Sequence, residues 1–266
     1  MKEKILAFLP GDHPGQALLH YENCVISTND SLKALAAQGA PEGTTMVAAM
    51  QTGGKGRMGR SFHSPDQKGV YLSFLLRPNC NPQELMHLTC AAAVAMHRAI
   101  LKTCGISVQV KWINDLICNQ KKLGGILTEM SIHPGTAVVD YAIIGVGINC
   151  LQKEEDFPCE LQKIATSLLI VSGKPIDPAN LASNMIAELW NLKQTLFAQK
   201  SAIMDLYKAL CITLGAEVKL LSANNEQTAK AVDINDNGAL LVKFPDGTQK
   251  EVSSGEVQVR GLYGYT

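Results

Sequence analysis

The chain has no excess of either charge. Its 266 residues contain 24 Lys and Arg against 24 Asp and Glu, so the formal net charge at pH 7 is zero. Proteins that bind nucleic acid through a basic surface carry a positive excess, and disordered polyelectrolytes combine high charge with few apolar residues. With 46% hydrophobic and 18% charged residues, the composition instead predicts a folded chain with a sizeable core.

The sequence also lacks closely spaced cysteine pairs and long apolar runs. Its eight cysteines form no C-x-x-C pair and have no close His partners, so a zinc site is not expected. Several, such as Cys90 and Cys118, stand in apolar stretches, where free cysteine behaves as a small hydrophobe. We therefore expect reduced thiols in a cytoplasmic protein. No run approaches the roughly 18 apolar residues of a membrane span, so no membrane partner is expected.

Helix and strand patterns alternate along residues 1–214. Apolar residues recur at a helical period over 83–103, and two further helices are expected within 179–213. Strand patterns cover 70–76, 106–112, 116–118, 125–130 and 138–148. Because strands follow one another over short loops, we predict an α+β fold with a mixed, largely antiparallel sheet flanked by helices.

The pattern changes after Gly215. Short strand patterns cover 217–221, 227–232, 239–244, 249–252 and 257–260. Turn signals such as Asn237-Gly238 separate them. We predict a compact β-barrel here, which divides the chain into domains 1–214 and 215–266. Five basic residues against seven acidic ones disfavour nucleic-acid binding by this barrel.

A glycine-rich basic stretch, QTGGKGRMGR, runs from Gln51 to Arg60. Its glycines allow the backbone to approach a ligand closely, and its cations suit an anion such as phosphate or carboxylate. The stretch is neither a Walker A loop nor a dinucleotide-binding G-x-G-x-x-G motif. Taken alone, it is explained equally well as a flexible solvated turn.

Other polar residues stand next to strand or helix patterns. Lys111 and Lys122 flank one turn and could meet one anion, although Asn-Asp at 114–115 is also an ordinary hairpin signal. Asn149 ends the buried strand pattern GVGIN, either as a ligand-facing amide or as an ordinary turn residue. Ser-Thr-Asn at 27–29 has the alternative role of a helix N-cap.

Taken together and in this order, the motifs resemble the biotin-protein ligases. The resemblance rests on six stretches: 27–29, 53–60, 111–116, 122–127, 145–149 and 255–260. It implies a catalytic domain like that of class II aminoacyl-tRNA synthetases and biotin synthetases, followed by an SH3-like β-barrel. The chain is most similar to the monofunctional type, which lacks an N-terminal DNA-binding domain.

This resemblance implies a two-step reaction. Biotin reacts with ATP, accompanied by Mg²⁺, to give biotinyl-5′-AMP, and a lysine of the carrier domain of acetyl-CoA carboxylase or a related carboxylase then takes the biotinyl group. No protein-ligated metal is implied, and the resemblance also allows a homodimer. Two alternatives remain open: a lipoate or octanoate ligase, and a non-catalytic biotin-binding module. A polar residue set suited to a ureido ring disfavours the first, and the retained cations disfavour the second.

The resemblance assigns site residues by motif. The biotin-binding residues are Ser27, Thr28, Asn29, Gln51, Lys55, Gly56, Arg57, Lys122 and Gly124. The ATP-binding residues are Phe62, Lys111, Asn114, Asp115 and Asn149. The catalytic residues are Arg57, Lys122 and Lys111. This chain departs from the family pattern where Lys55 replaces Arg, Phe62 replaces Trp and Ile113 replaces Pro.

We expect no specific DNA binding. Some relatives carry an N-terminal helix-turn-helix domain, which needs about 60 residues, three packed helices with one in the groove. Here 26 residues precede Ser27. A gel-shift assay with a biotin-operator sequence should show no biotin-dependent complex, and tight operator binding would contradict this prediction.

Overall fold

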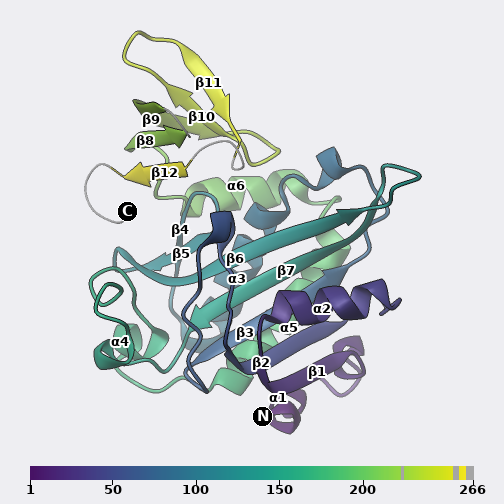
Figure 1. Ribbon diagram of the computed structural model, residues 1–266. Helices are drawn as coiled ribbons and strands as arrows, with labels where there is room; N and C mark the ends of the chain where they lie inside the picture. Colours follow the sequence, from purple (N-terminus) through teal and green to yellow (C-terminus); the bar gives the residue numbers. More distant parts are fainter. Residues whose placement is uncertain (223–224, 254–257, 262–266) are drawn as a thin grey trace.

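The computed structural model describes residues 1–222, 225–253 and 258–261. Its larger sheet has seven strands in the order β1-β2-β3-β7-β6-β5-β4 (Figure 1). Strand β1 is parallel to β2, and the other neighbouring pairs are antiparallel. The strands are β1 (Leu19–Val25), β2 (Thr45–Gln51), β3 (Gly69–Leu76), β4 (Gln109–Lys111), β5 (Asp115–Cys118), β6 (Lys121–Ile132) and β7 (Val139–Asn149). The predicted mixed, largely antiparallel sheet is therefore confirmed.

Helices flank this sheet. The α-helices are α1 (Lys2–Phe8), α2 (Thr28–Ala37), α3 (Leu88–Cys104), α4 (Leu168–Ser172), α5 (Pro178–Thr195) and α6 (Lys200–Leu210). Short 3-10 helices lie at Pro14–Gln16, Arg57–Gly59, Pro82–Leu85 and Glu154–Asp156. The helix predicted over 83–103 is α3 preceded by a 3-10 turn, and it ends where Gly105 takes a φ of 73°. None of these described helices is long and apolar enough to cross a membrane.

The large sheet buries apolar side chains on both faces. Leu75 and Ile143 pack with Leu32 of α2 on one face. Phe74 and Ile144, each one position along the same strands, point to the opposite face and join the main core. In Figure 1, α2 lies in front of the sheet and α3 and α5 lie behind it. The face toward α2 is also the face on which the cavity described below opens.

The residues before α2 are part of this fold. Helix α1 contacts α5 and buries Ile5 completely. Strand β1 extends the sheet beyond β2. The sequence patterns indicated neither α1 nor β1, because both are short and lie at the edge, where the apolar period is weak.

The second sheet is antiparallel and has the order β11-β10-β9-β8-β12. Its strands are β8 (Glu217–Ser222), β9 (Asn225–Ile234), β10 (Leu240–Lys243), β11 (Gln249–Val252) and β12 (Gln258–Gly261). The all-β module is thus confirmed, while its closure into an SH3-like barrel and a domain boundary at 214 remain predictions. Of the predicted motif 255–260, residues 255–257 lie outside the described residues.

The eight cysteines are all unpaired. Cys90, Cys118, Cys150 and Cys211 are buried. Burial raises the pKa of the Cys150 thiol to about 12, so this side chain stays neutral at physiological pH. These four residues therefore act as small hydrophobes in the core, as the sequence predicts for Cys90 and Cys118.

Candidate active site

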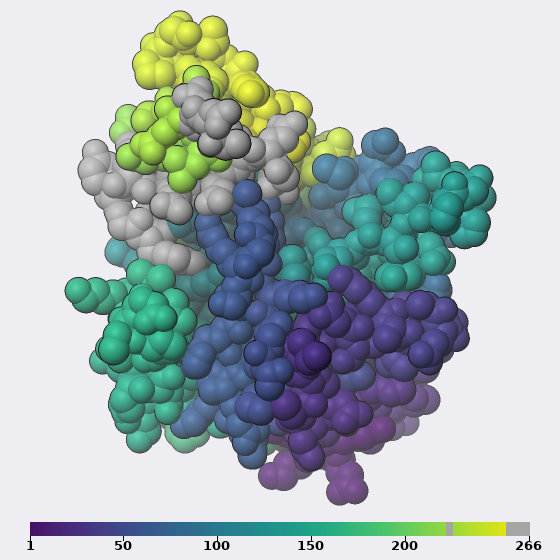
Figure 2. Space-filling model, viewed as in Figure 1, coloured from purple at the N-terminus to yellow at the C-terminus, as the bar shows by residue number. Residues whose placement is uncertain are grey.

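A cavity of about 480 Å³ lies where the N-terminus of α2, the end of β2 and strands β6 and β7 meet. Sites for small organic ligands typically have volumes of roughly 300–1,000 Å³. Part of the cavity wall is the glycine-rich stretch 52–61, called the basic loop below, which lies at the front surface in Figure 2. The polar lining residues are Ser27, Thr28, Asn29, Gln51, Lys55, Arg57, Arg60, Ser61, Lys111, Asn114, Asp115 and Lys122.

The N-terminus of α2 supplies hydrogen-bonding groups to this cavity. Ser27 occupies the N-cap position, as the alternative reading of this motif predicts, but its side chain makes no capping hydrogen bond. The backbone N–H and the hydroxyl of Thr28 both donate to Gln51 Oε1, at 2.9 and 3.1 Å. Gln51 Nε2 in turn donates to Ser64 Oγ at 2.9 Å. These bonds fix the orientation of the Gln51 amide at the end of β2.

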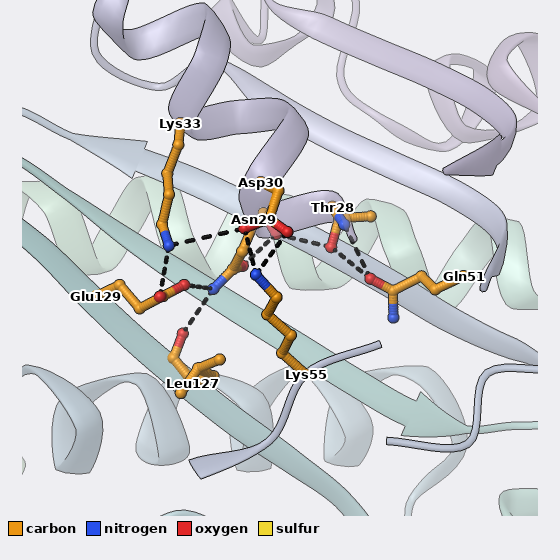
Figure 3. A network of polar contacts seen from close by, with 9 residues as sticks. Thr28, Asn29, Asp30, Lys33, Gln51, Lys55, Leu127 and Glu129 are labelled. Carbon is orange, nitrogen blue, oxygen red and sulfur yellow. Dashed lines mark hydrogen bonds and ion pairs between the residues drawn. The ribbon is translucent and has the colours of Figure 1, made fainter. Parts of the chain in front are cut away.

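Asn29 is buried and is held by a network that also carries charge (Figure 3). Its Nδ2 donates to Glu129 Oε2 at 2.7 Å, and its Oδ1 accepts from Ser73 Oγ at 2.6 Å. Lys33 forms an ion pair with the same Glu129 carboxylate, at 2.5 Å. The network ties α2 to β3 and β6. Glu129 and Ser73 were not predicted from the sequence, although Glu129 is a charged residue within a strand pattern.

Lys55 reaches from the basic loop to α2 (Figure 3). Its Nζ lies 2.6 Å from Asp30 Oδ2, and the hydrogen bond with Asp30 raises the pKa of Lys55. Since Lys55 and Asp30 are both substantially exposed, this ion pair contributes little stability. The Lys55 side chain is thus paired within the protein, at the wall of the cavity.

Backbone hydrogen bonds close the base of the basic loop. Gly56 N donates to Arg60 O at 2.7 Å, and Phe62 N donates to Gly54 O at 2.8 Å. A Cβ on Gly54 would lie 2.6 Å from Phe62 O, so only glycine fits there. Met58, at the tip, has a φ of 56°. These bonds close the base of the stretch, while residues 58–61 at its tip are exposed, so the flexible-turn alternative stays a prediction for the tip.

Arg57 connects the basic loop to the turn between β4 and β5. Its Nη1 donates to Asn114 Oδ1 at 3.3 Å, and Asn114 Nδ2 donates to Ile126 O at 2.9 Å. Burial lowers the pKa of Arg57, and the nearby Asp115 carboxylate opposes this shift. A guanidinium remains charged at neutral pH even so. The Asn-Asp hairpin turn and the ligand-facing site are therefore compatible, since Asn114 both stabilises the turn and lines the cavity.

Lys122 and Lys111 line the same cavity, as their flanking positions predict. Lys122 Nζ lies 2.6 Å from Asp115 Oδ1, which fixes the position of this ammonium group. Lys111 pairs with Asp115 in the β4–β5 register. The Trp112–Ile113 peptide bond in the intervening turn is cis. Three cationic side chains, Arg57, Lys111 and Lys122, therefore line the same cavity.

Phe62 lies against strand β7, where two glycines make room for neighbouring side chains. A Cβ on Gly147 would come within 2.5 Å of the Phe62 ring, and a Cβ on Gly145 would overlap the Asn29 amide. Phe62 also makes an edge contact with Tyr71, with ring centroids 6.4 Å apart. The glycines of the GVGIN motif therefore leave the space that the Asn29 amide and the Phe62 ring occupy at the cavity.

Gly124 does not line the cavity, contrary to its predicted role. It pairs with Ile148, whereas Gly125 pairs with Gly147. Because side chains alternate across a strand, Gly125 shares the cavity face with Gly147, and Gly124 points to the opposite face. A Cβ on Gly124 would lie 2.5 Å from Gly147 O, so this glycine permits close strand packing.

Asn149 also lies outside the cavity lining. Its Nδ2 donates to Thr166 O at 2.9 Å, and its Oδ1 accepts from Gln152 Nε2 at 3.0 Å. Thr166 N donates to Lys122 O at 2.8 Å, so the segment held by Asn149 runs beside the start of β6. In this structure the Asn149 amide binds the 152–166 segment and does not reach the cavity.

The remaining predicted residues, Gly56 and Phe62 among them, line the cavity. Residues that the sequence motifs did not assign complete the wall: Met58, Arg60, Ser61, Trp112, Gly125, Ile126, Leu127, Gly145, Val146, Gly147 and Ile164. Several of these residues lie within the motifs 53–60, 111–116, 122–127 and 145–149. Their position in a motif is the sequence signal that could have predicted them as cavity residues. Ile164 belongs to none of the motifs. It lies beside Lys122 only in the folded chain, where Lys122 N donates to Ile164 O, so the sequence alone gave no signal for it.

Comparison with known proteins assigns a class to this fold and cavity. Residues 21–149 match the Biotin/lipoate A/B protein ligase family, and residues 213–260 match the Biotin protein ligase C terminal domain. The bifunctional ligase/repressor BirA of Bacillus subtilis is 37% identical over 90% of this chain and 73% of its own length. The biotin–[acetyl-CoA-carboxylase] ligase of Mycobacterium tuberculosis is 32% identical over 87% of this chain and 85% of its own.

Solved structures show the same likeness. The biotin protein ligase of Aquifex aeolicus, in complex with biotin and ATP, has a TM-score of 0.76 and is 30% identical, covering 91% of this chain and 98% of that chain. That of Leishmania major, in complex with biotinyl-5-AMP, has a TM-score of 0.61 and is 26% identical, covering 89% and 98%. The chain belongs to the biotin protein ligase family.

Substitution Gly145→Ala should destabilise the protein. The added Cβ would displace the buried Asn29 amide from the buried Ser73 and the half-buried Glu129, and leaving a buried amide unsatisfied costs about 2 kcal/mol. Urea denaturation would measure the loss of unfolding free energy. Gly11→Ala is the control, since a Cβ there meets nothing within 4 Å. Equal stability of the two variants would contradict the prediction.

Proposed function

We propose that this chain is an ATP-dependent biotin ligase. It activates biotin as biotinyl-5′-AMP and transfers the biotinyl group to a lysine of the biotin carboxyl carrier domain of acetyl-CoA carboxylase or a related carboxylase. The observation that carries the proposal is one cavity with a hydrogen-bonding end at α2 and a cationic end at the β4–β5 turn. The names and ligands of the relatives support the same activity.

The end at α2 suits the ureido ring of biotin, which has both donors and acceptors. The Ser27 hydroxyl caps no backbone group, and Thr28 and Gln51 are oriented by their mutual bonds. Leu127 provides apolar wall for the fused rings and the alkyl chain. A site of this kind rejects ligands that leave its polar groups unpaired, which favours biotin over a plain acyl chain.

The end at the β4–β5 turn suits ATP. Lys111, Asn114 and Asp115 offer charged and polar groups there, and the Phe62 ring offers a flat apolar surface for adenine. Asn149, which the motifs assign to ATP, contributes by supporting the segment beside Lys122.

Arg57 and Lys122 are suited to the first chemical step. A biotin carboxylate oxygen attacks the α-phosphorus of ATP, the bond from that phosphorus to the bridging oxygen breaks, and pyrophosphate leaves. Two anions must meet for this attack, and charge develops on the phosphoryl oxygens. Fixed cations lower this barrier because they need no reorganisation during the step. Asn114 and Asp115 hold the two cations in place.

In the second step the carrier lysine amine attacks the carbonyl carbon of the mixed anhydride. The carbon–oxygen bond to AMP breaks, an amide forms, and the amine loses a proton. The same cations stabilise the departing phosphate charge of AMP.

Mg²⁺ enters as part of the substrate MgATP. Among the described residues no three His, Cys, Asp or Glu side chains gather to hold a metal. Mg²⁺ is commonly held by one or two carboxylates together with substrate phosphates. Asp115 is a cavity-lining carboxylate that fits this mode. The ion would neutralise part of the phosphate charge.

We also propose a cytoplasmic location. Eight unpaired cysteines are consistent with a reducing compartment.

The activity is tested with purified protein, biotin, ATP, Mg²⁺ and a carrier domain. We expect pyrophosphate release that depends on biotin, and a mass increase of the carrier by one biotinyl group. Turnover with lipoate but not biotin would indicate a lipoate ligase. Biotin binding without pyrophosphate release would indicate a binding module, and either result would overturn the proposal.

Arg57→Ala and Lys122→Ala should each slow adenylation by about 100-fold, because a fixed charge at a developing oxyanion is worth about 3 kcal/mol. Isotope exchange between pyrophosphate and ATP measures this step. Lys121→Ala is a matched control, since Lys121 neighbours Lys122 but its Nζ bonds to Gln162 O. Exchange at the wild-type rate in both cavity variants would refute their assigned roles.

A further inference from the structure

Trp112 joins the cavity to the C-terminal sheet. It lies in the turn between β4 and β5, lines the cavity, and is only 6% exposed. Its indole Nε1 donates to Gly238 O at 2.9 Å. Gly238 belongs to the turn between β9 and β10 of the second sheet. One side chain therefore contacts both the candidate nucleotide end of the cavity and a module far along the chain.

Other buried hydrogen bonds fix the same β4–β5 turn. Trp112 N donates to Thr213 Oγ1 at 2.9 Å, and the Tyr207 hydroxyl donates to Ile113 O at 3.1 Å. In both bonds the partner of the turn, Thr213 or Tyr207, lies outside β4 and β5. On the cavity side, Asn114 of the same turn bonds to β6. The position of Asn114 and Lys111 thus depends on groups from α6, its following segment and the second sheet.

The β9–β10 turn is itself rigid and fits closely. Asn235 Oδ1 accepts from the N–H groups of Asn237 and Ala239, at 3.0 and 2.9 Å. Gly238 has a φ of 82°, and a Cβ there would lie 2.9 Å from Cys90 Sγ of α3. No side chain fits between this turn and α3. A displacement of the turn would therefore be transmitted to the Trp112 indole.

We propose that Trp112 is a positioning residue through which the C-terminal sheet sets the geometry of the ATP end of the cavity. The Trp112–Gly238 hydrogen bond holds the turn that presents Lys111 and Asn114, and the biotin end, built from α2, β2 and β7, does not depend on it. This inference rests on the proposed function, because it takes the β4–β5 turn as the nucleotide end.

Trp112→Phe removes the N–H donor and keeps an aromatic ring. We expect the KM for ATP to rise about tenfold, the usual effect of losing one buried hydrogen bond, with the KM for biotin changed by less than about twofold. Trp190→Phe is a matched control, because Trp190 is the other tryptophan and its Nε1 has no hydrogen-bond partner. Its KM values should equal those of the wild type.

Gly238→Ala tests the same contact from the C-terminal side. It should also raise the KM for ATP selectively, because the added Cβ pushes the turn away from Cys90. Gly247→Ala is the control, since Gly247 has a similar φ of 89° in the same sheet but a Cβ there meets nothing within 4 Å. It shares the backbone strain and should leave both KM values unchanged.

Steady-state pyrophosphate release with each substrate varied in turn gives both KM values, and thermal melting shows whether each variant folds. A merely structural role would lower melting temperature and active fraction without separating the two KM values. Unchanged or equally raised KM values in Trp112→Phe would overturn the proposal, and Gly238→Ala decides it if Trp112→Phe does not fold. Wild-type protein without biotin-dependent pyrophosphate release would instead overturn the proposed function.

Discussion

Strand β7 lies at the centre of the large sheet and has no side chain at two positions that face the cavity. Gly145 leaves room for the Asn29 amide from α2, and Gly147 leaves room for the Phe62 ring at the end of the basic loop. Glycine in a strand interior weakens the strand, because it has no side chain to pack and loses more entropy on folding. Here the weakening is offset by the apolar pairs that β7 makes with β3 and β6 on its other face. The cavity exists because two elements can approach the sheet directly at these positions.

The cations around the cavity are held by neighbouring carboxylates. Lys122 is paired with Asp115, and Lys55 is paired with Asp30. Such pairing fixes where each cation lies before a ligand arrives, and fixed charge is more effective toward a transition state than charge that must reorganise. It also explains how a chain of zero net charge can hold a cationic site, since local acids balance the local bases.

The sequence predicted those parts of the fold whose patterns are repeated and local. Strands β3 to β7 and helices α3, α5 and α6 have apolar residues at a regular period along their own length. The motifs at 111–116, 122–127 and 145–149 lie in or next to these strands. Gly124 and Asn149 could not be placed from motifs alone. Whether Gly124 or Gly125 faces the ligand depends on the strand register, and a one-residue difference reverses the face. Asn149 shares the face of Gly147, but a segment 17 residues further on covers it, which no local pattern indicates.

The walls of the cavity differ in stiffness, and this difference follows from burial. At α2 the buried Asn29 amide is bonded to Ser73 of β3 and to the half-buried Glu129 of β6, so its displacement would leave a buried amide unsatisfied. The tip of the basic loop is more exposed, and its ion pair between Lys55 and Asp30 is screened by water and salt. The tip of the loop is therefore held by weaker contacts than the Asn29 amide. A ligand can enter past the loop and meet a site whose hydrogen-bonding groups are already oriented, which is the arrangement that loses least entropy on binding.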